Sequence, residues 1–83
     1  MNPYIGQICL FPWDWTPTGW AKCDGSLLSI SSNQALFSLI GTTYGGDGRT
    51  NFGLPDLRGK RAQNSDKRVG YFISLQGIYP SRS

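Results

Sequence analysis

Residues 19–59 read GWAKCDGSLLSISSNQALFSLIGTTYGGDGRTNFGLPDLRG, and this stretch contains the strongest structural signals of the chain. It sets an Asp-Gly turn at residues 24–25 before a short apolar segment, a helix signal and a glycine-rich stretch. Ser31 and Gln34 have the Ser-x-x-Gln spacing of a capping box. Gly41 lies at the position where a glycine in the left-handed conformation commonly ends a helix. We therefore expect one short helix that is capped at Ser31 and ends before Gly41.

The expected helix has one apolar side, formed by Leu36, Phe37 and Ile40. It is about two and a half turns long, which is too short to be stable alone, so this side must pack on a sheet or on a neighbouring subunit. Residues 42–53 (TTYGGDGRTNFG) follow with four glycines. Such a stretch predicts a long irregular loop that has positive φ angles or passes close to another chain.

Four segments of the chain have the composition of β-strands. Residues 4–11 (YIGQICLF) predict a first strand, and residues 20–23 and 26–30 predict two short strands on either side of the Asp-Gly turn. Residues 69–79 (VGYFISLQGIY) predict a last strand that returns beside the first. The sequence thus predicts a small single α+β domain with a short antiparallel or mixed sheet, its first and last strands paired and the helix packed across it. The expected core residues are Trp20, Leu36, Phe37, Ile40, Phe72 and Leu75.

The composition argues against most catalytic classes. The chain has 83 residues, a net charge of +3, five acidic residues that are all Asp, and no His. General acid–base catalysis at neutral pH most often uses His, so we expect no enzyme activity and no catalytic residues. Asp24, Asp47 and Asp56 lie beside Gly or Pro in turns and match no EF-hand spacing, so no metal or cofactor is expected.

Five of the eight basic residues fall between Arg58 and Arg68. Phe52 and Tyr71 flank this stretch and do not interleave with it, so we expect an exposed basic linker at residues 60–68 and no nucleic-acid binding. No segment approaches the ~18 apolar residues of a membrane span, and the first residues lack the pattern of a conventional signal peptide.

Two residue types leave alternatives open. Cys9 and Cys23 can pair if neighbouring strands bring them together, although two cysteines make no disulfide framework. Trp13, Trp15 and Trp20 suit either a sugar-stacking platform or the core of a small domain. The two-residue spacing of Trp13 and Trp15 puts both on one face of an extended chain, and we favour a core or subunit interface.

Four blocks of the sequence resemble the phage tail collar domain of short tail fibres and microcystin-dependent proteins. They are residues 5–8 (IGQI), 19–25 (GWAKCDG), 30–48 (ISSNQALFSLIGTTYGGDG) and 52–59 (FGLPDLRG). Residues 72–82 (FISLQGIYPSR) also resemble the strand that closes the longer members of the family. Those members have a long variable region where this chain has a short linker. The resemblance therefore divides residues 1–83 into a collar motif at 5–59, a basic linker at 60–68 and a closing strand at 69–80.

The resemblance implies a structural module of a tail fibre or fibre-like appendage, usually trimeric, whose more distal region contacts the host receptor. It brings no catalytic residues. We expect a homo-oligomer, trimer or filament, in a virion tail or extracellular appendage, with other tail or appendage proteins as further partners. The residues expected at subunit contacts are Tyr44, Asp47, Arg49, Asp56 and Arg58. The alternative function is binding of a cell-surface glycan or receptor through Trp13, Trp15 and the loop at residues 45–50.

Overall fold

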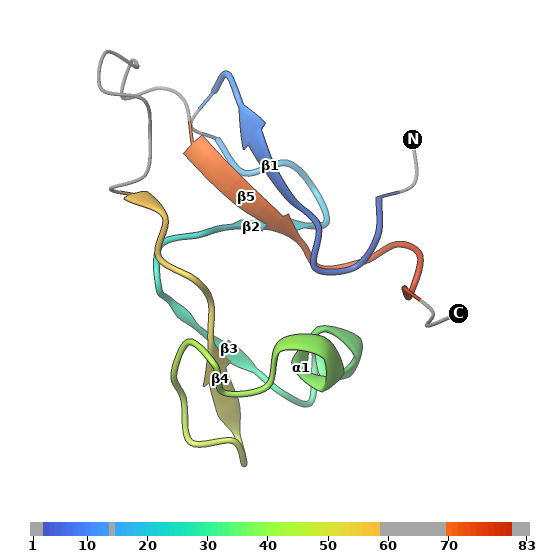
Figure 1. The fold of residues 1–83 in the computed structure, drawn as a ribbon, viewed down its shortest axis with the longest axis vertical. Coiled ribbons are helices and arrows are strands. Elements are labelled where there is room, and N and C mark those ends of the chain that lie inside the picture. The colour runs from blue at the N-terminus through green and yellow to red at the C-terminus, as the bar shows by residue number, and fades with distance from the viewer. Residues whose placement is uncertain (1–2, 14, 59–69, 81–83) are drawn as a thin grey trace.

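A computed structural model describes residues 3–13, 15–58 and 70–80 of the chain, which form two small antiparallel sheets and one helix (Figure 1). The elements in chain order are β1 (Ile8–Phe11), β2 (Trp20–Lys22), β3 (Leu27–Ser29), α1 (Gln34–Ile40), β4 (Asn51–Gly53) and β5 (Gly70–Ser74). The architecture confirms the α+β class. The expected linker at residues 60–68 lies outside the described residues.

The larger sheet has the strand order β1-β5-β2, so the last strand lies in the middle. Its pairing with β1 sets Ile8 opposite Ile73, which confirms that the first and last strands pair. The first strand is shorter than predicted, because Gly6 has a φ of +85° and the Gln7 amide donates to the Tyr4 carbonyl in a turn. The last strand likewise ends at Ser74 and not at residue 79.

The smaller sheet pairs β3 with β4, where Leu28 lies opposite Phe52. We expected residues 51–53 to belong to the glycine-rich loop, and that expectation was wrong. The chain after the Asp-Gly turn forms this second sheet instead of pairing with β2. Asp24 itself forms an isolated bridge with Asp56, which holds the turn beside the segment that follows β4.

The helix begins at Gln34 and has Asn33 as its N-cap, without a side-chain capping bond. The capping box predicted at Ser31 and Gln34 was therefore wrong. The Ser31 hydroxyl instead lies 2.9 Å from the Ser29 hydroxyl, and the Asn33 side-chain amide donates to the Ser29 carbonyl. At the other end the Gly41 amide donates to the Phe37 carbonyl, and Gly41 has a φ of +55°. The helix thus begins two residues later than expected, which is about half a turn.

The main core lies between the larger sheet, the helix and the β3–β4 pair. Its buried members are Cys23, Leu36, Phe52, Leu54 and Ile73. Leu36 and Phe72 are buried as expected, whereas Trp20, Phe37, Ile40 and Leu75 are half-buried. The sequence pattern did not identify Phe52, Leu54 and Ile73, because the first two were assigned to a loop and a turn.

The outer face of the larger sheet carries a second apolar layer. Phe72 is fully buried there, and the pairing puts Cys9 and Lys22 beside it on the same face. The ring of Phe11 lies 5.6 Å from that of Phe72 and 5.2 Å from that of Trp20, measured between centroids. Aromatic rings therefore cover the side of the sheet that faces away from the main core.

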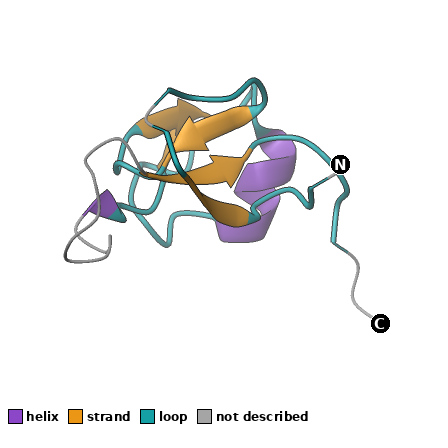
Figure 2. Cartoon of the chain, turned by 90° about the horizontal axis from the view of Figure 1, so that it is seen from above, coloured by secondary structure: helices purple, strands orange, loops and turns teal. Residues whose placement is uncertain are grey.

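The segments that lead to the two ends of the chain run side by side near the helix (Figures 1 and 2). The Ile5 amide donates to the Ile78 carbonyl, and the Ile78 amide donates to the Pro3 carbonyl, each at 2.9 Å. The Tyr79 hydroxyl lies 2.7 Å from the Ser38 hydroxyl on α1. These contacts fix both segments to the domain.

Candidate functional site

The Asp47 carboxylate organises the loop between α1 and β4. Its Oδ1 accepts hydrogen bonds from the amides of Arg49, Thr50 and Asn51 at 2.8–3.1 Å, and its Oδ2 accepts one from the Thr50 hydroxyl. These donors, led by the Arg49 amide, lower the pKa of Asp47 well below its usual range. The side chain expected at a subunit contact is therefore engaged within its own loop.

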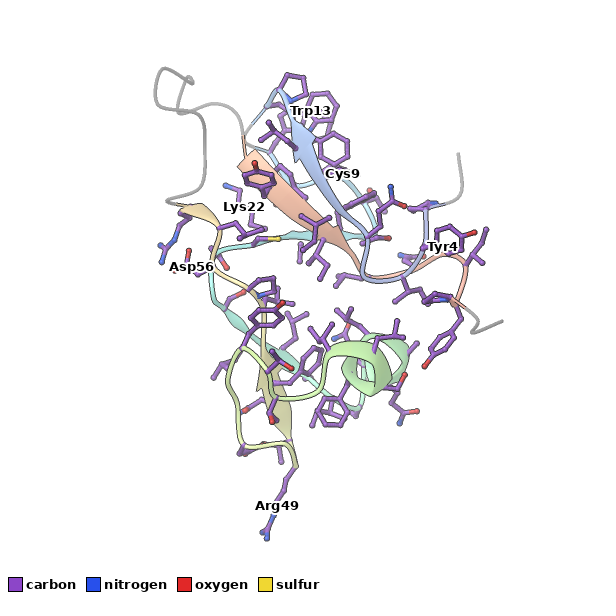
Figure 3. All side chains as sticks on the ribbon, viewed as in Figure 1. Tyr4, Cys9, Trp13, Lys22, Arg49 and Asp56 are labelled. Carbon is purple, nitrogen blue, oxygen red and sulfur yellow. The ribbon has the colours of Figure 1, made fainter. Side chains whose placement is uncertain are left out.

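Close backbone packing holds the same loop against β4. A Cβ atom at Gly53 would collide with the Tyr44 carbonyl, so this position accepts no side chain. The Gly53 amide donates to the Gly45 carbonyl at 2.9 Å. Tyr44 is 50% exposed on this loop, and Arg49 points away from the domain at its tip (Figure 3). The loop thus presents an aromatic and a cationic side chain to the outside.

Asp56 and Arg58 form an ion pair with each other. The Arg58 Nε donates to Oδ1 of Asp56 at 2.9 Å, and a second guanidinium nitrogen donates to Oδ2 at 2.7 Å. The hydrogen bonds from Arg58 lower the pKa of Asp56 to about 2. Both side chains are exposed, so water and salt screen the pair and its contribution to stability is small.

The structure separates the five expected contact residues into two groups. Tyr44, Asp47 and Arg49 belong to the loop before β4, whereas Asp56 and Arg58 lie after it. Figure 3 shows Arg49 at the far tip of the domain and Asp56 beside the larger sheet. A subunit contact at these residues stays a prediction.

The two tryptophans of the alternative site belong to an ordered stack of rings. Phe11 and Trp13 are parallel within 10° with centroids 5.0 Å apart, and Trp13 and Trp15 are parallel within 10° at 4.9 Å. Phe11 is anchored in turn by Trp20 and Phe72 of the outer aromatic layer. Phe11, Trp13 and Trp15 are named the aromatic stack below.

The outermost ring of the aromatic stack, that of Trp15, is exposed to solvent. Trp15 is 60% exposed, whereas Trp13 is half-buried between the two other rings. The Trp13 indole N–H is buried and has no acceptor among the described residues. A buried tryptophan N–H usually has a partner, so this donor is an unusual feature of the stack.

The alternative site is not a single surface. Trp13 lies at one end of the domain and Arg49, within the loop at residues 45–50, lies at the opposite end (Figure 3). Sequence reasoning identified Trp13 and Trp15 but missed Phe11, the ring that connects them to the sheet. The regular two-residue spacing of positions 11, 13 and 15 was the signal that could have found it.

Both cysteines are free thiols. Cys23 is buried in the main core, and burial, assisted by the nearby Asp24 charge, raises its pKa to about 11. Cys9 is half-buried on β1, where the Gln7 side-chain amide contacts its sulfur. The pairing left open by the sequence is therefore not formed.

Two further kinds of feature are absent from the described part of the chain. Residues 3–13, 15–58 and 70–80 contain no group of three or more His, Cys, Asp or Glu side chains that could hold a metal ion. Within the same residues, no helix has the length and apolar character needed to cross a bilayer.

The sequence matches the family model described as Phage Tail Collar Domain over residues 6–62. It is also 38% identical over 64 residues to the short tail fiber protein gp12 of Enterobacteria phage T4. That match covers 76% of this chain but only 12% of the relative, so the chain spans a small part of the fibre protein's length.

The two matches are to structural proteins of phage tail fibres, and the matched family is not an enzyme family. The chain belongs to the phage tail collar domain family. Both comparisons support a location in the tail of a phage particle.

Proposed function

We propose that this chain is a non-enzymatic structural subunit of a phage tail fibre or related extracellular appendage, which acts through homo-oligomerisation as a trimer or filament. The observation that carries the proposal is the collar-family match over residues 6–62. Other tail proteins are proposed as further partners, because the matched relative is a short tail fiber protein.

Self-association is supported by apolar side chains that the small domain leaves exposed. Three of them, Tyr4, Ile78 and Tyr79, lie where the two ends of the chain run side by side, and they are named the terminal patch. Hydrogen bonds of the two segments to each other and to Ser38 hold this patch in place. A rigid apolar surface loses little conformational entropy when a second copy covers it.

The terminal patch is therefore the first candidate for the subunit contact, with Tyr44 and Arg49 of the loop as the second. The side chains of Asp47, Asp56 and Arg58 have hydrogen-bond partners within their own chain. These three residues remain proposed at subunit contacts, where the bonds within their own chain fix the orientation of their side chains.

Light scattering at several protein concentrations, with negative-stain images of the same samples, tests the proposal. We expect a discrete trimer or polymers of indefinite length, and a folded monomer at every concentration would contradict oligomerisation. Ile78→Ser should move the mass toward the monomer. Leu27→Ser is the matched control, because Leu27 is 57% exposed and Ile78 is 47% exposed, but Leu27 lies on β3 outside the patch.

A further inference from the structure

We propose that strand β1 pairs antiparallel with β1 of a second copy of this chain, about a twofold axis at Cys9. The inference rests on the self-association proposed above and names a contact separate from the terminal patch. In Figure 1, β1 lies on the outer side of β5, and no strand of the described residues pairs with its other edge.

The outer edge of β1 presents backbone groups without partners. The Ser74 amide of β5 donates to the Gln7 carbonyl at 2.9 Å, so this part of the Gln7 backbone faces β5. Residues of an antiparallel strand alternate in direction, and the backbone of Cys9 therefore also faces β5. The amides and carbonyls of Ile8 and Leu10 face the other way, and no described residue bonds to these four groups.

The other outer edges of the two sheets are partly occupied. On β4 the Asn51 carbonyl accepts a hydrogen bond from the loop before it, and on β3 the Ser29 carbonyl accepts one from the Asn33 side chain. On β2 the Trp20 amide donates to the preceding turn, and Lys22 adds an exposed charge. Charges and prolines commonly protect an edge against unwanted pairing. Strand β1 (ICLF) has neither, so it is the described edge best suited to accept another strand.

The side chains beside these backbone groups are apolar and exposed. Ile8 is 40% exposed and Leu10 is 51% exposed, and both point to the face of the sheet that carries Ile73. A second β1 would bring Ile8 of each copy opposite Leu10 of the other, which covers both side chains. An extended strand also supplies the amides and carbonyls that the edge lacks, whereas a helix would leave them unpaired.

The backbone of the edge favours one register. With Cys9 opposite Cys9, Ile8 of each copy exchanges hydrogen bonds with Leu10 of the other, and all four groups of each edge are paired. A shift of two residues in one direction sets Leu10 opposite Gly6, whose amide already donates within its own chain. The opposite shift sets Ile8 opposite Pro12, which has no amide hydrogen.

The symmetry of this contact limits what it can build. A twofold contact uses the same surface on both copies, so by itself it joins only two chains. Two strands of four residues also bury less than the ~800 Å² per partner of a stable interface, so the contact acts together with another one. Alternation with a contact at the terminal patch would extend the assembly into a filament.

Oxidation of the intact chain by diamide, at several protein concentrations, tests the contact. In the proposed register the two Cys9 Cα atoms are about 4.5 Å apart, which suits a disulfide. Diamide takes up the two electrons and two protons that the thiols lose as the disulfide forms. We expect non-reducing electrophoresis to show a dimer in which mass spectrometry finds Cys9 joined to Cys9, and Cys9→Ser should abolish it.

Two variants test the register and the edge. Leu10→Cys in the Cys9→Ser background moves the thiol to a more exposed position, but these thiols lie on residues at least about 7–8 Å apart, so dimers should form about tenfold more slowly. Leu10→Lys with Cys9 intact adds a charge to the edge and should also slow the Cys9 dimer about tenfold. Leu27→Lys on β3 is the matched control, because Leu27 is 57% exposed and Leu10 is 51% exposed.

The outcomes separate this contact from oligomerisation itself. A wild-type chain that is oligomeric by light scattering but forms no Cys9 dimer would overturn the β1 contact alone. Dimers that form as fast from Leu10→Cys as from Cys9, or equal rates for Leu10→Lys and Leu27→Lys, would overturn it as well. A wild-type chain that is monomeric at every concentration would overturn the proposed self-association and this contact with it.

Discussion

Replacing Leu36 by alanine should remove much of the stability of the domain. Leu36 is the buried residue of α1 and packs in one cluster with Phe52 of β4 and Ile73 of β5. The substitution deletes three carbon groups, which corresponds to about 2.4 kcal/mol at ~0.8 kcal/mol for each. The remaining cavity raises the loss in the free energy of unfolding to about 3 kcal/mol. A chain of 83 residues has about 4–12 kcal/mol in total.

Leu39→Ala on the same helix is the matched control. It makes the same change in composition and helix propensity, but Leu39 is already 36% exposed and leaves no enclosed cavity. We expect it to cost about 1 kcal/mol. Urea unfolding followed by tryptophan fluorescence, at two protein concentrations, measures both variants. With an m-value of about 1 kcal/mol/M, Leu36→Ala should lower the midpoint by about 3 M. Equal losses for the two variants would refute the packing argument.

Three further predictions follow from the loop, the strands and the thiols. Asp47→Ala should speed hydrogen exchange of the Arg49, Thr50 and Asn51 amides, and unchanged rates would exclude the carboxylate as their acceptor. Folding lowers the pKa of Asp47, so its ionised carboxylate stabilises the loop fully above the unfolded pKa of about 3.9. This stabilisation is lost as the pH falls through the folded pKa, and these three amides of the wild-type chain should therefore lose protection from hydrogen exchange only in strong acid. Gly53→Ala should destabilise the domain far more than Gly70→Ala, because a Cβ at Gly53 collides with the Tyr44 carbonyl whereas at Gly70 it makes ordinary contacts, and thermal unfolding compares them. Iodoacetamide at pH 8 should label Cys9 well before Cys23, whose pKa is raised to about 11, and equal rates by mass spectrometry would contradict the buried position of Cys23.

Local patterns predicted the elements whose signals are local. Leu36 and Ile40 have helical spacing, and a helix is present at Gln34–Ile40. The capping box failed because the Asn33 and Ser31 side chains each have a competing partner at Ser29, which sequence spacing alone does not reveal. Side chains of this type bond readily to nearby backbone in more than one way. The sequence therefore predicted the presence of the helix but not the residue at which it begins.

For the candidate site, the sequence identified residue types more reliably than their neighbours. Asp47 was recognised as a turn residue, but its three amide donors depend on the folded loop. Trp13 and Trp15 were recognised as a pair, but the contact of Trp13 with Phe11 depends on the path of the chain after β1. A subunit contact at Asp56 and Arg58 stays a prediction, and their ion pair with each other was not foreseen although the two residues are close in sequence.

The α+β class, the pairing of the first and last strands and the collar-family membership could be predicted from the linear chain, because they follow from composition, periodicity and motif order. Three features became visible only in the folded domain: β5 lies between β1 and β2, Asn51–Gly53 pairs with β3, and Phe52 and Ile73 share a core with Leu36. Strand pairing and core packing join residues that are far apart in the sequence. Each such contact is selected by the burial of the whole domain, which no local window contains.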